Sequence, residues 1–138
     1  MANLKSVIRL RKFELDERRR AVVDLEKNLD NLDRQINRIH DSLAAEMQNA
    51  REDEAARMAF PNFNQRMQKN LVGLNAERSK LLVAIDKAKE ELQDAFKELK
   101  TIEITERERQ ARKEAEEKHK ENNMLDEIGL EQHRRRKK

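Results

Sequence analysis

The sequence predicts an all-α fold, an antiparallel two-helix coiled-coil hairpin, and three observations lead to that prediction. Apolar residues recur in alternating steps of four and three along much of the 138-residue chain, which is the spacing of a coiled-coil seam. Only two Gly and one Pro occur, too few for the turns of a sandwich, a barrel or an α/β fold. The chain is 43% charged and 3% aromatic, which suits long helices better than a globular core. High charge alone would also allow disorder, but a sustained seam argues against it.

The first helix is predicted over about residues 3–58. Its seam keeps one heptad frame for more than six heptads, with charged residues on both sides. The seam positions are Leu4, Ile8, Arg11, Leu15, Arg18, Val22, Leu25, Leu29, Leu32, Ile36, Ile39, Leu43, Glu46 and Ala50.

A single break predicts the turn, over about residues 59–64. Pro61 cannot continue a helix and disfavours helical backbone at the residue before it. The Asn residues that follow can cap a new helix. Phe60 and Phe63 flank the turn, where they either staple the helix ends together or form an exposed apolar tip that docks a partner.

The second helix is predicted over about residues 65–121, followed by a C-terminal tail over about residues 122–138. After the last seam residue the heptad frame continues without apolar side chains, so this part can be helical but has no seam of its own. The second seam is Met67, Leu71, Leu74, Arg78, Leu81, Ile85, Ala88, Leu92, Ala95, Leu99 and Ile102.

The two seams predict a register. With the turn centred on Asn62, the residue numbers of facing seam positions should add to 124, and apolar residues then meet apolar residues through most of the hairpin. In this register Glu46 faces Arg78, and Arg18 faces Glu106. Because an unpaired buried charge is costly, these two pairs are interpreted as a register pin. The alternative is that both pairs are accidental and solvated.

The same register leaves the end of the hairpin that holds the chain termini poorly packed. Leu4, Val7, Ile8 and Phe13 have no apolar partner on the second helix, so they either fray or are kept for another protein. The last apolar cluster, Leu125–Leu130, lies beyond the reach of the first helix. It is predicted to dock as an amphipathic helix in a partner's groove, the alternative being an inert, frayed tail.

The basic run Arg134–Lys138 ends the chain. It is interpreted as a flexible tail that contacts an acidic partner surface or aids solubility. Contact with nucleic acid or anionic lipid is the alternative, but a short run without interleaved aromatic residues binds nucleic acid only weakly.

No chemistry is expected of this sequence. There is no Cys, and His40, His119 and His133 each lack a second ligand at metal spacing. No phosphate loop, nucleophile elbow or acid–base pair is present, so no catalytic residue, cofactor site or metal site is predicted and the protein is not expected to be an enzyme. No apolar run is long enough to be a signal peptide or to span a bilayer, so a cytoplasmic location is expected.

The layout resembles the FliJ family of flagellar export proteins over nearly the whole chain. The resemblance rests on the opening Leu4–Lys12 followed by heptads, on the central break, and on the long charged second helix through Glu106–Arg109. It also rests on the closing Asn123–Leu130, which resembles the family's acidic and apolar C-terminal element and is likewise followed by a basic end.

This resemblance implies a non-enzymatic stalk or adaptor of the flagellar type III protein export apparatus. In the family the terminal end of the hairpin inserts in the ring of the export ATPase, and another part contacts the cytoplasmic domain of the membrane export gate. Export chaperones are further partners. The protein would be cytoplasmic and peripherally associated with the inner-membrane apparatus, with no nucleic acid bound and no direct membrane insertion.

The resemblance assigns two binding ends. The ATPase end comprises Leu4, Val7, Ile8, Arg11, Phe13, Leu125, Ile128, Arg134, Arg135 and Arg136. The gate end comprises Ile39, Leu43, Met47, Phe60, Phe63 and Met67, most of which also lie on the seam. Two other functions remain open on the sequence alone: a generic coiled-coil scaffold that self-associates, and a nucleic-acid-binding module led by the basic tail.

Overall fold

The structure, a computed structural model, describes residues 4–137, and it consists of two helices. Helix α1 runs from Leu4 to Glu52 and helix α2 from Glu54 to Arg136. The two helices pack against each other and no strand occurs in the described residues, so the predicted all-α two-helix hairpin is confirmed. The described residues divide into a unit of Glu14–Ala95, here called the hairpin unit, and a terminal unit that groups the start of α1 up to Phe13 with the part of α2 from Phe96 onward.

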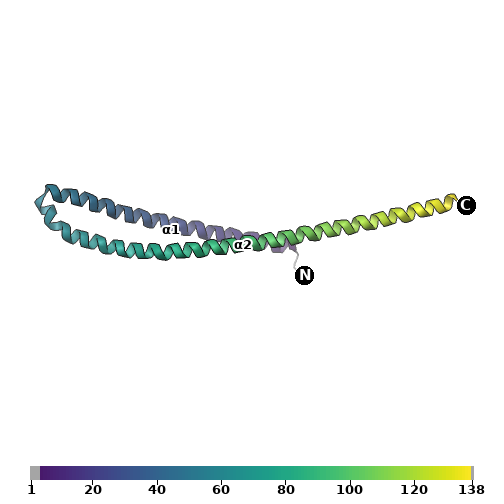
Figure 1. Ribbon diagram of the computed structural model, residues 1–138, viewed down its shortest axis with the longest axis horizontal. Helices are drawn as coiled ribbons and strands as arrows, with labels where there is room; N and C mark the ends of the chain where they lie inside the picture. The colour runs from purple at the N-terminus through teal and green to yellow at the C-terminus, as the bar shows by residue number, and fades with distance from the viewer. Residues whose placement is uncertain (1–3, 138) are drawn as a thin grey trace. The chain divides into compact units, whose positions relative to one another are not determined.

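In the hairpin unit the chain reverses direction between α1 and α2 (Figure 1). Asp53, the residue between the two helices, is the N-terminal cap of α2. The Asp53 carboxylate accepts a hydrogen bond from the Ala56 backbone N–H at 3.3 Å, and its carbonyl accepts one from the Arg57 N–H at 3.0 Å. The Asp53 N–H in turn donates to the Asn49 carbonyl at 2.9 Å. Asp is among the best N-cap residues because its side chain satisfies a backbone donor that the helix leaves free.

Arg57 caps the other side of the reversal, the C-terminal end of α1. Its Nε donates to the Ala50 carbonyl at 3.0 Å and its Nη2 to the Arg51 carbonyl at 3.4 Å. These carbonyls belong to the last turn of α1, whose acceptors have no partner within the helix. Among the described residues no backbone φ is positive, so side-chain caps replace the Gly that usually ends a helix.

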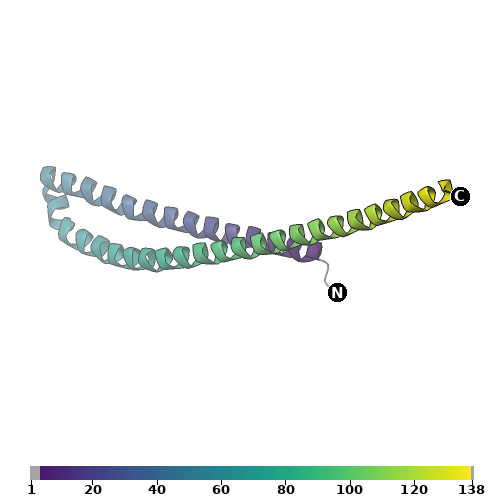
Figure 2. The same ribbon diagram turned by 45° about the vertical axis from the view of Figure 1, so that its right-hand side comes forward.

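The turn predicted over residues 59–64 is therefore wrong. Helix α1 ends at Glu52 rather than near 58, α2 begins at Glu54 rather than near 65, and Pro61 lies inside α2. Proline removes the hydrogen bond that the Arg57 carbonyl would receive, which bends a helix without always ending it. The first turns of α2 are bent, as Figure 2 shows.

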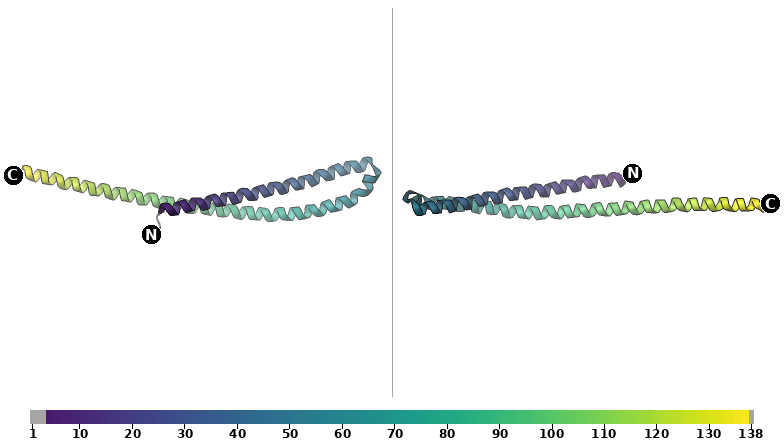
Figure 3. Two further views of the ribbon diagram at one scale, coloured as in Figure 1. Left: turned by 180° about the vertical axis from the view of Figure 1, so that it is seen from behind. Right: turned by 90° about the horizontal axis from the view of Figure 1, so that it is seen from above.

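Three ion pairs between the helices of the hairpin unit give the register. Their residue numbers add to values between 109 and 115, not to 124, so the observed register differs from the predicted one by about two heptads. The pairs are Arg18–Glu91 at 2.9 Å, Arg78–Asp33 at 2.7 Å and Lys89–Glu26 at 3.7 Å. The two antiparallel helices can be followed from behind and from above in Figure 3.

The predicted register pin is also wrong. Arg78 donates its Nε hydrogen bond to Asp33 instead of meeting Glu46, and Arg18 pairs with Glu91 instead of Glu106. The physical reason is the position of the turn. A shift by whole heptads keeps every seam position on the facing side of its helix, so the turn and not the pattern chooses the partners.

The predicted seams themselves are correct, because every buried apolar residue belongs to one of them. None is completely excluded from solvent in the described chain, as expected when each helix has one neighbour only. The buried apolar residues are Leu15, Val22, Leu43, Leu71, Ile85 and Ala88 in the hairpin unit and Leu99 in the terminal unit.

In the terminal unit the start of α1 packs against α2. Arg11 Nη1 lies 3.4 Å from Glu98 Oε2, and Leu4, Val7 and Ile8 are half-buried.

The predicted end of the second helix near residue 121 and the tail after it are wrong, because α2 continues to Arg136. Residues 111–136, here called the extension, are helical and exposed along their whole length. Charged pairs four residues apart, such as Glu131 with Arg135 at 3.8 Å, support a helix that has no apolar neighbour.

Substitutions at two positions test where the chain turns. Pro61→Ala is expected to raise the free energy of unfolding by about 1–3 kcal/mol, because it restores a helix hydrogen bond. Asp53→Ala is expected to lower it by about 1 kcal/mol through loss of the cap, whereas Asp53→Asn, which keeps the cap, should change it little. Urea unfolding followed by circular dichroism measures all three. If Pro61→Ala lowered the free energy of unfolding and Asp53→Ala left it unchanged, the turn would lie at residues 59–64 instead.

Candidate partner-binding surfaces

Glu106 marks the end of the seam in the terminal unit. Among residues 4–137 it is the charged side chain that is buried, with 8% of its surface exposed. Its Oε1 accepts a hydrogen bond from Gln110 Nε2 at 3.0 Å, and its Oε2 lies 3.3 Å from Arg109 Nε. After Gln110, which is half-buried, every described residue of α2 is exposed.

These neighbours lower the pKa of the Glu106 carboxyl. The Gln110 hydrogen bond is the largest cause and burial opposes it, while the positive charges of Arg109 and Lys5 lower the pKa further. The carboxylate therefore stays ionised at neutral pH. The apolar seam therefore ends at a buried, ionised side chain whose hydrogen bond and ion pair are made to residues of its own helix. The extension, which follows it, has no neighbouring helix in the terminal unit.

The extension carries an apolar stripe on one side. Met124, Leu125 and Ile128 lie within one helical turn of each other and, with Glu121, line a shallow depression of about 300 Å³. All three are exposed, Leu125 by 64%. Leu130 is equally exposed but lies on another side of the helix, given its spacing from the stripe. An amphipathic helix with no neighbour is the form in which many segments enter a partner's groove.

The basic end of the chain is part of this helix, so the expected flexible tail is not observed. Arg134, Arg135 and Arg136 lie in the last turn of α2 and are exposed. Positive side chains there interact favourably with the carbonyl end of the helix dipole.

The residues predicted for the ATPase end fall into two sets. Leu4, Val7, Ile8 and Arg11 are half-buried against α2, so the expectation that this segment is unpacked is wrong. The shift in register is the reason, because it places the start of α1 beside a part of α2 that still carries seam residues, as the ion pair between Arg11 and Glu98 indicates. Phe13, Leu125, Ile128 and the three terminal arginines remain exposed.

The residues predicted for the gate end are mostly part of the helix contact. Leu43 is buried, and Ile39, Phe60, Phe63 and Met67 are half-buried, which favours the staple over an exposed tip for the two Phe side chains. Only Met47 of this set is well exposed.

Sequence reasoning missed the most exposed apolar residues of the hairpin unit. Met58 is 77% exposed, Val72 71% and Val83 70%. Val72 and Val83 belong to a stripe, here called the outer stripe, that also contains the exposed Ala76 and Ser79. Its steps of four, three and four repeat the spacing of the seam residues Leu74, Arg78, Leu81 and Ile85 two positions earlier in the chain, and this second, interleaved pattern is the signal that could have revealed it.

The described residues contain no grouping of three or more His, Cys, Asp or Glu that could hold a metal ion. Over residues 4–137, neither α1 nor α2 contains an apolar stretch of the length that crossing a bilayer requires. In comparisons with known proteins, no family model, no curated protein and no solved structure matches the chain.

The lowered pKa of Glu106 predicts how its contribution to stability depends on pH. A carboxyl whose pKa is lower in the folded state stabilises the fold above its usual value, here 4.5, and loses that effect as pH falls through the lowered pKa. Glu106→Gln should therefore be less stable than the wild type at pH 7, and the difference should shrink at pH 3. Urea midpoints of both proteins at the two pH values test this. A difference that stays constant with pH would show that the Glu106 charge does not stabilise the seam end.

Proposed function

We propose that the protein is a non-enzymatic stalk or adaptor of the flagellar type III export apparatus. In this proposal the terminal unit inserts in the ring of the export ATPase, and the hairpin unit contacts the cytoplasmic domain of the membrane export gate. The single observation that carries the proposal is the extension, a helix without a neighbour that bears an apolar stripe and a basic end.

The dimensions of the extension support a role inside a ring. A single α-helix is about 10–12 Å wide with its side chains, and residues 111–136 would reach about 39 Å at 1.5 Å per residue. A pore contact requires a narrow, largely polar rod with a few apolar anchors. Met124, Leu125 and Ile128 provide such anchors, and the terminal arginines provide charge for an acidic surface of the ring.

The gate contact is better assigned to exposed residues than to the seam. Ile39, Leu43, Phe60, Phe63 and Met67 are occupied by the contact between α1 and α2. The outer stripe and Met58 are free to meet another protein, and the stripe has the spacing of a helix face that packs on a partner. This proposal therefore moves the gate contact to Met47, Met58, Val72 and Val83.

The proposal places the protein in the cytoplasm, associated with the inner-membrane export apparatus through these protein contacts. It binds no nucleic acid and does not insert in the membrane. Export chaperones form a third class of partner.

The test is whether the protein changes the assembly or rate of a hexameric export ATPase through the stripe on the extension. Leu125→Asp combined with Ile128→Asp should leave helicity unchanged and weaken ATPase binding at least tenfold, about 1.4 kcal/mol, because it places charge in an apolar contact. Leu130→Asp, the same change on another side of the helix, is the matched control and should bind normally.

Analytical ultracentrifugation and ATP hydrolysis rates measure the two effects. No change in ATPase assembly or rate on mixing with the wild-type protein would contradict the proposal, as would equal behaviour of the two variants.

A further inference from the structure

Glu46 places a charge on the seam of α1 in the hairpin unit. Its side chain is half-buried and, within residues 4–137, forms no ion pair or hydrogen bond with another residue. Arg78, the charged seam residue of α2 in this unit, reaches off the seam to Asp33 at 2.7 Å. Because a partly buried charge without a partner weakens the contact between two helices, the observed register leaves this part of the seam poorly matched.

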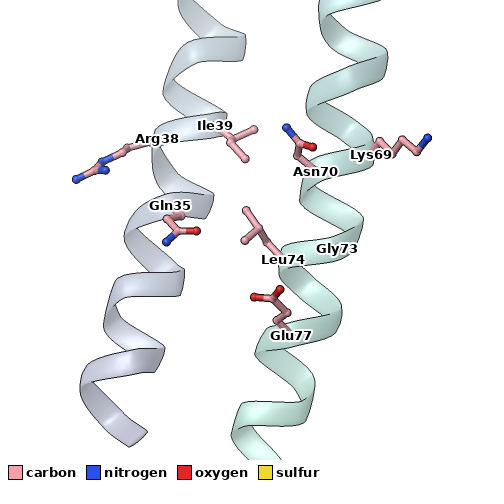
Figure 4. A pocket seen from close by; sticks show the side chains of 8 residues that line it. All are labelled: Gln35, Arg38, Ile39, Lys69, Asn70, Gly73, Leu74 and Glu77. Carbon is pink, nitrogen blue, oxygen red and sulfur yellow. The ribbon is translucent and has the colours of Figure 1, made fainter. Parts of the chain in front are cut away.

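The apolar seam is also incompletely covered in the middle of the hairpin. Ile39 of α1 and Leu74 of α2 point toward each other across an open groove of about 520 Å³ (Figure 4). The α1 seam residues from Leu25 to Ile39 are all half-exposed, whereas Val22 and Leu43 on either side are buried. A close fit of knobs into holes would cover these positions evenly, so the two seams fit each other imperfectly in this register.

A slide of two heptads matches the seams better in this region. The residue numbers of facing seam positions would then add to 124, so that Glu46 faces Arg78 and every other seam residue of α1 between 29 and 50 faces an apolar residue of α2. A slide of one heptad does worse, since it sets Glu46 opposite Leu71 and Arg78 opposite Ile39. The heptad pattern therefore supports a register two heptads away and disfavours the one between.

Pro61 provides a second place for the chain to reverse. It lies inside α2, where it removes a helix hydrogen bond and bends the first turns. When facing numbers add to 124, the reversal falls at residue 62, directly after this proline. Residues 54–58 would then pass from α2 to the end of α1, and Pro61 would stand in a turn, where its ring is well tolerated. The loss of the caps at Asp53 and Arg57 keeps the observed register the favoured one.

We propose that the hairpin has a second register, two heptads from the observed one, in which Glu46 pairs with Arg78 and the chain reverses beside Pro61. Helix α1 slides along α2 by about 21 Å, the length of fourteen helical residues. Ratcheting of one packed element past another by whole turns is an established form of switching. The observed register is the main state of the free chain, and the second register is a minor state of the same molecule.

The slide changes how much of α2 stays free. In the terminal unit the start of α1 moves by the same distance toward the C-terminal end of α2 and covers the first residues of the extension. The free part of the extension becomes shorter, so a protein that binds all of it holds the observed register. The inference does not rest on the proposed export function, because the isolated protein is sufficient to test it.

The absence of Cys from the chain allows the second register to be trapped by disulfides. Ile39→Cys is combined in turn with Leu74→Cys, Leu81→Cys and Ala88→Cys. These three positions are spaced by one heptad on α2 and report the observed register, a slide of one heptad and a slide of two. Dilute protein is oxidised, and non-reducing electrophoresis measures how fast the link within one chain forms.

The order of the three rates decides the question. The 39–74 link should form fastest, and the 39–88 link should form about tenfold faster than the 39–81 link, because the intermediate register sets two charges against apolar residues. Random opening of the hairpin gives the opposite order, since position 81 lies closer to position 39 than position 88 does. A 39–81 link that forms as fast as the 39–88 link, or a 39–88 link that does not form, would overturn the proposal.

A charge change on the seam tests the pairing of Glu46. In the variant with cysteines at positions 39 and 88, Glu46→Lys should slow the link about tenfold, because it sets two positive charges face to face. Asp41→Lys is the matched control, the same change in charge at an exposed position off the seam, and should leave the rate unchanged. Equal rates in the two variants would contradict the pairing of Glu46 with Arg78.

The two turn signals should act in opposite directions on the same link. Pro61→Ala should slow the 39–88 link, because it removes the break at which the second register reverses. Asp53→Ala should speed it, because it removes a cap of the observed turn. Circular dichroism checks that both variants stay helical. Rates that move together in the two variants would show that the link reports general opening rather than a second register.

Discussion

The hydrogen bonds that Asp53 and Arg57 make around the end of α1 determine which residues of the two helices meet. Asp53 begins α2 with its carboxylate, and Arg57 reaches back to the last free carbonyls of α1. A heptad seam is nearly the same after a shift of seven or fourteen residues, so the seam alone leaves several registers close in energy. The turn removes that degeneracy, because it fixes the point from which pairing is counted.

The position of the turn also determines what remains unpaired. Reversal at Asp53 lets the start of α1 pack on the part of α2 that ends near Glu106 and Gln110. The residues that follow have no apolar partner in the terminal unit, and they stay helical to Arg136. A turn at residues 59–64 would have paired more of α2 and left a shorter free segment. The extension and its apolar stripe, on which the proposed function depends, thus follow from two side-chain caps.

Periodicity in the sequence was sufficient to predict the fold class and the seams. Residues such as Val22, Leu43 and Leu99 are buried where their heptad positions predict. The turn was not predictable in the same way. Pro61 is the stronger signal for a break, whereas Asp53 and Arg57 are ordinary surface residues until both helices are in place. The predicted pin at Glu46 and Arg78 depended on that turn and was wrong with it.

The candidate surfaces were predicted in part. Leu125, Ile128 and the terminal arginines are exposed, but Leu4, Val7 and Ile8 are half-buried because the true register covers them. The outer stripe was missed because its few apolar residues alternate in the sequence with those of a much stronger seam.

The central claim is that the chain turns at Asp53, which shifts the pairing of the helices by two heptads from the register expected for a turn at residues 59–64. Two distances between labelled positions test this claim. Spin labels on Asn31→Cys with Ser79→Cys should give a short distance by pulsed electron paramagnetic resonance. Labels on Asn31→Cys with Gln93→Cys should lie farther apart by a displacement along the helix of about 21 Å for fourteen residues. The opposite order, with positions 31 and 93 the closer pair, would contradict the account.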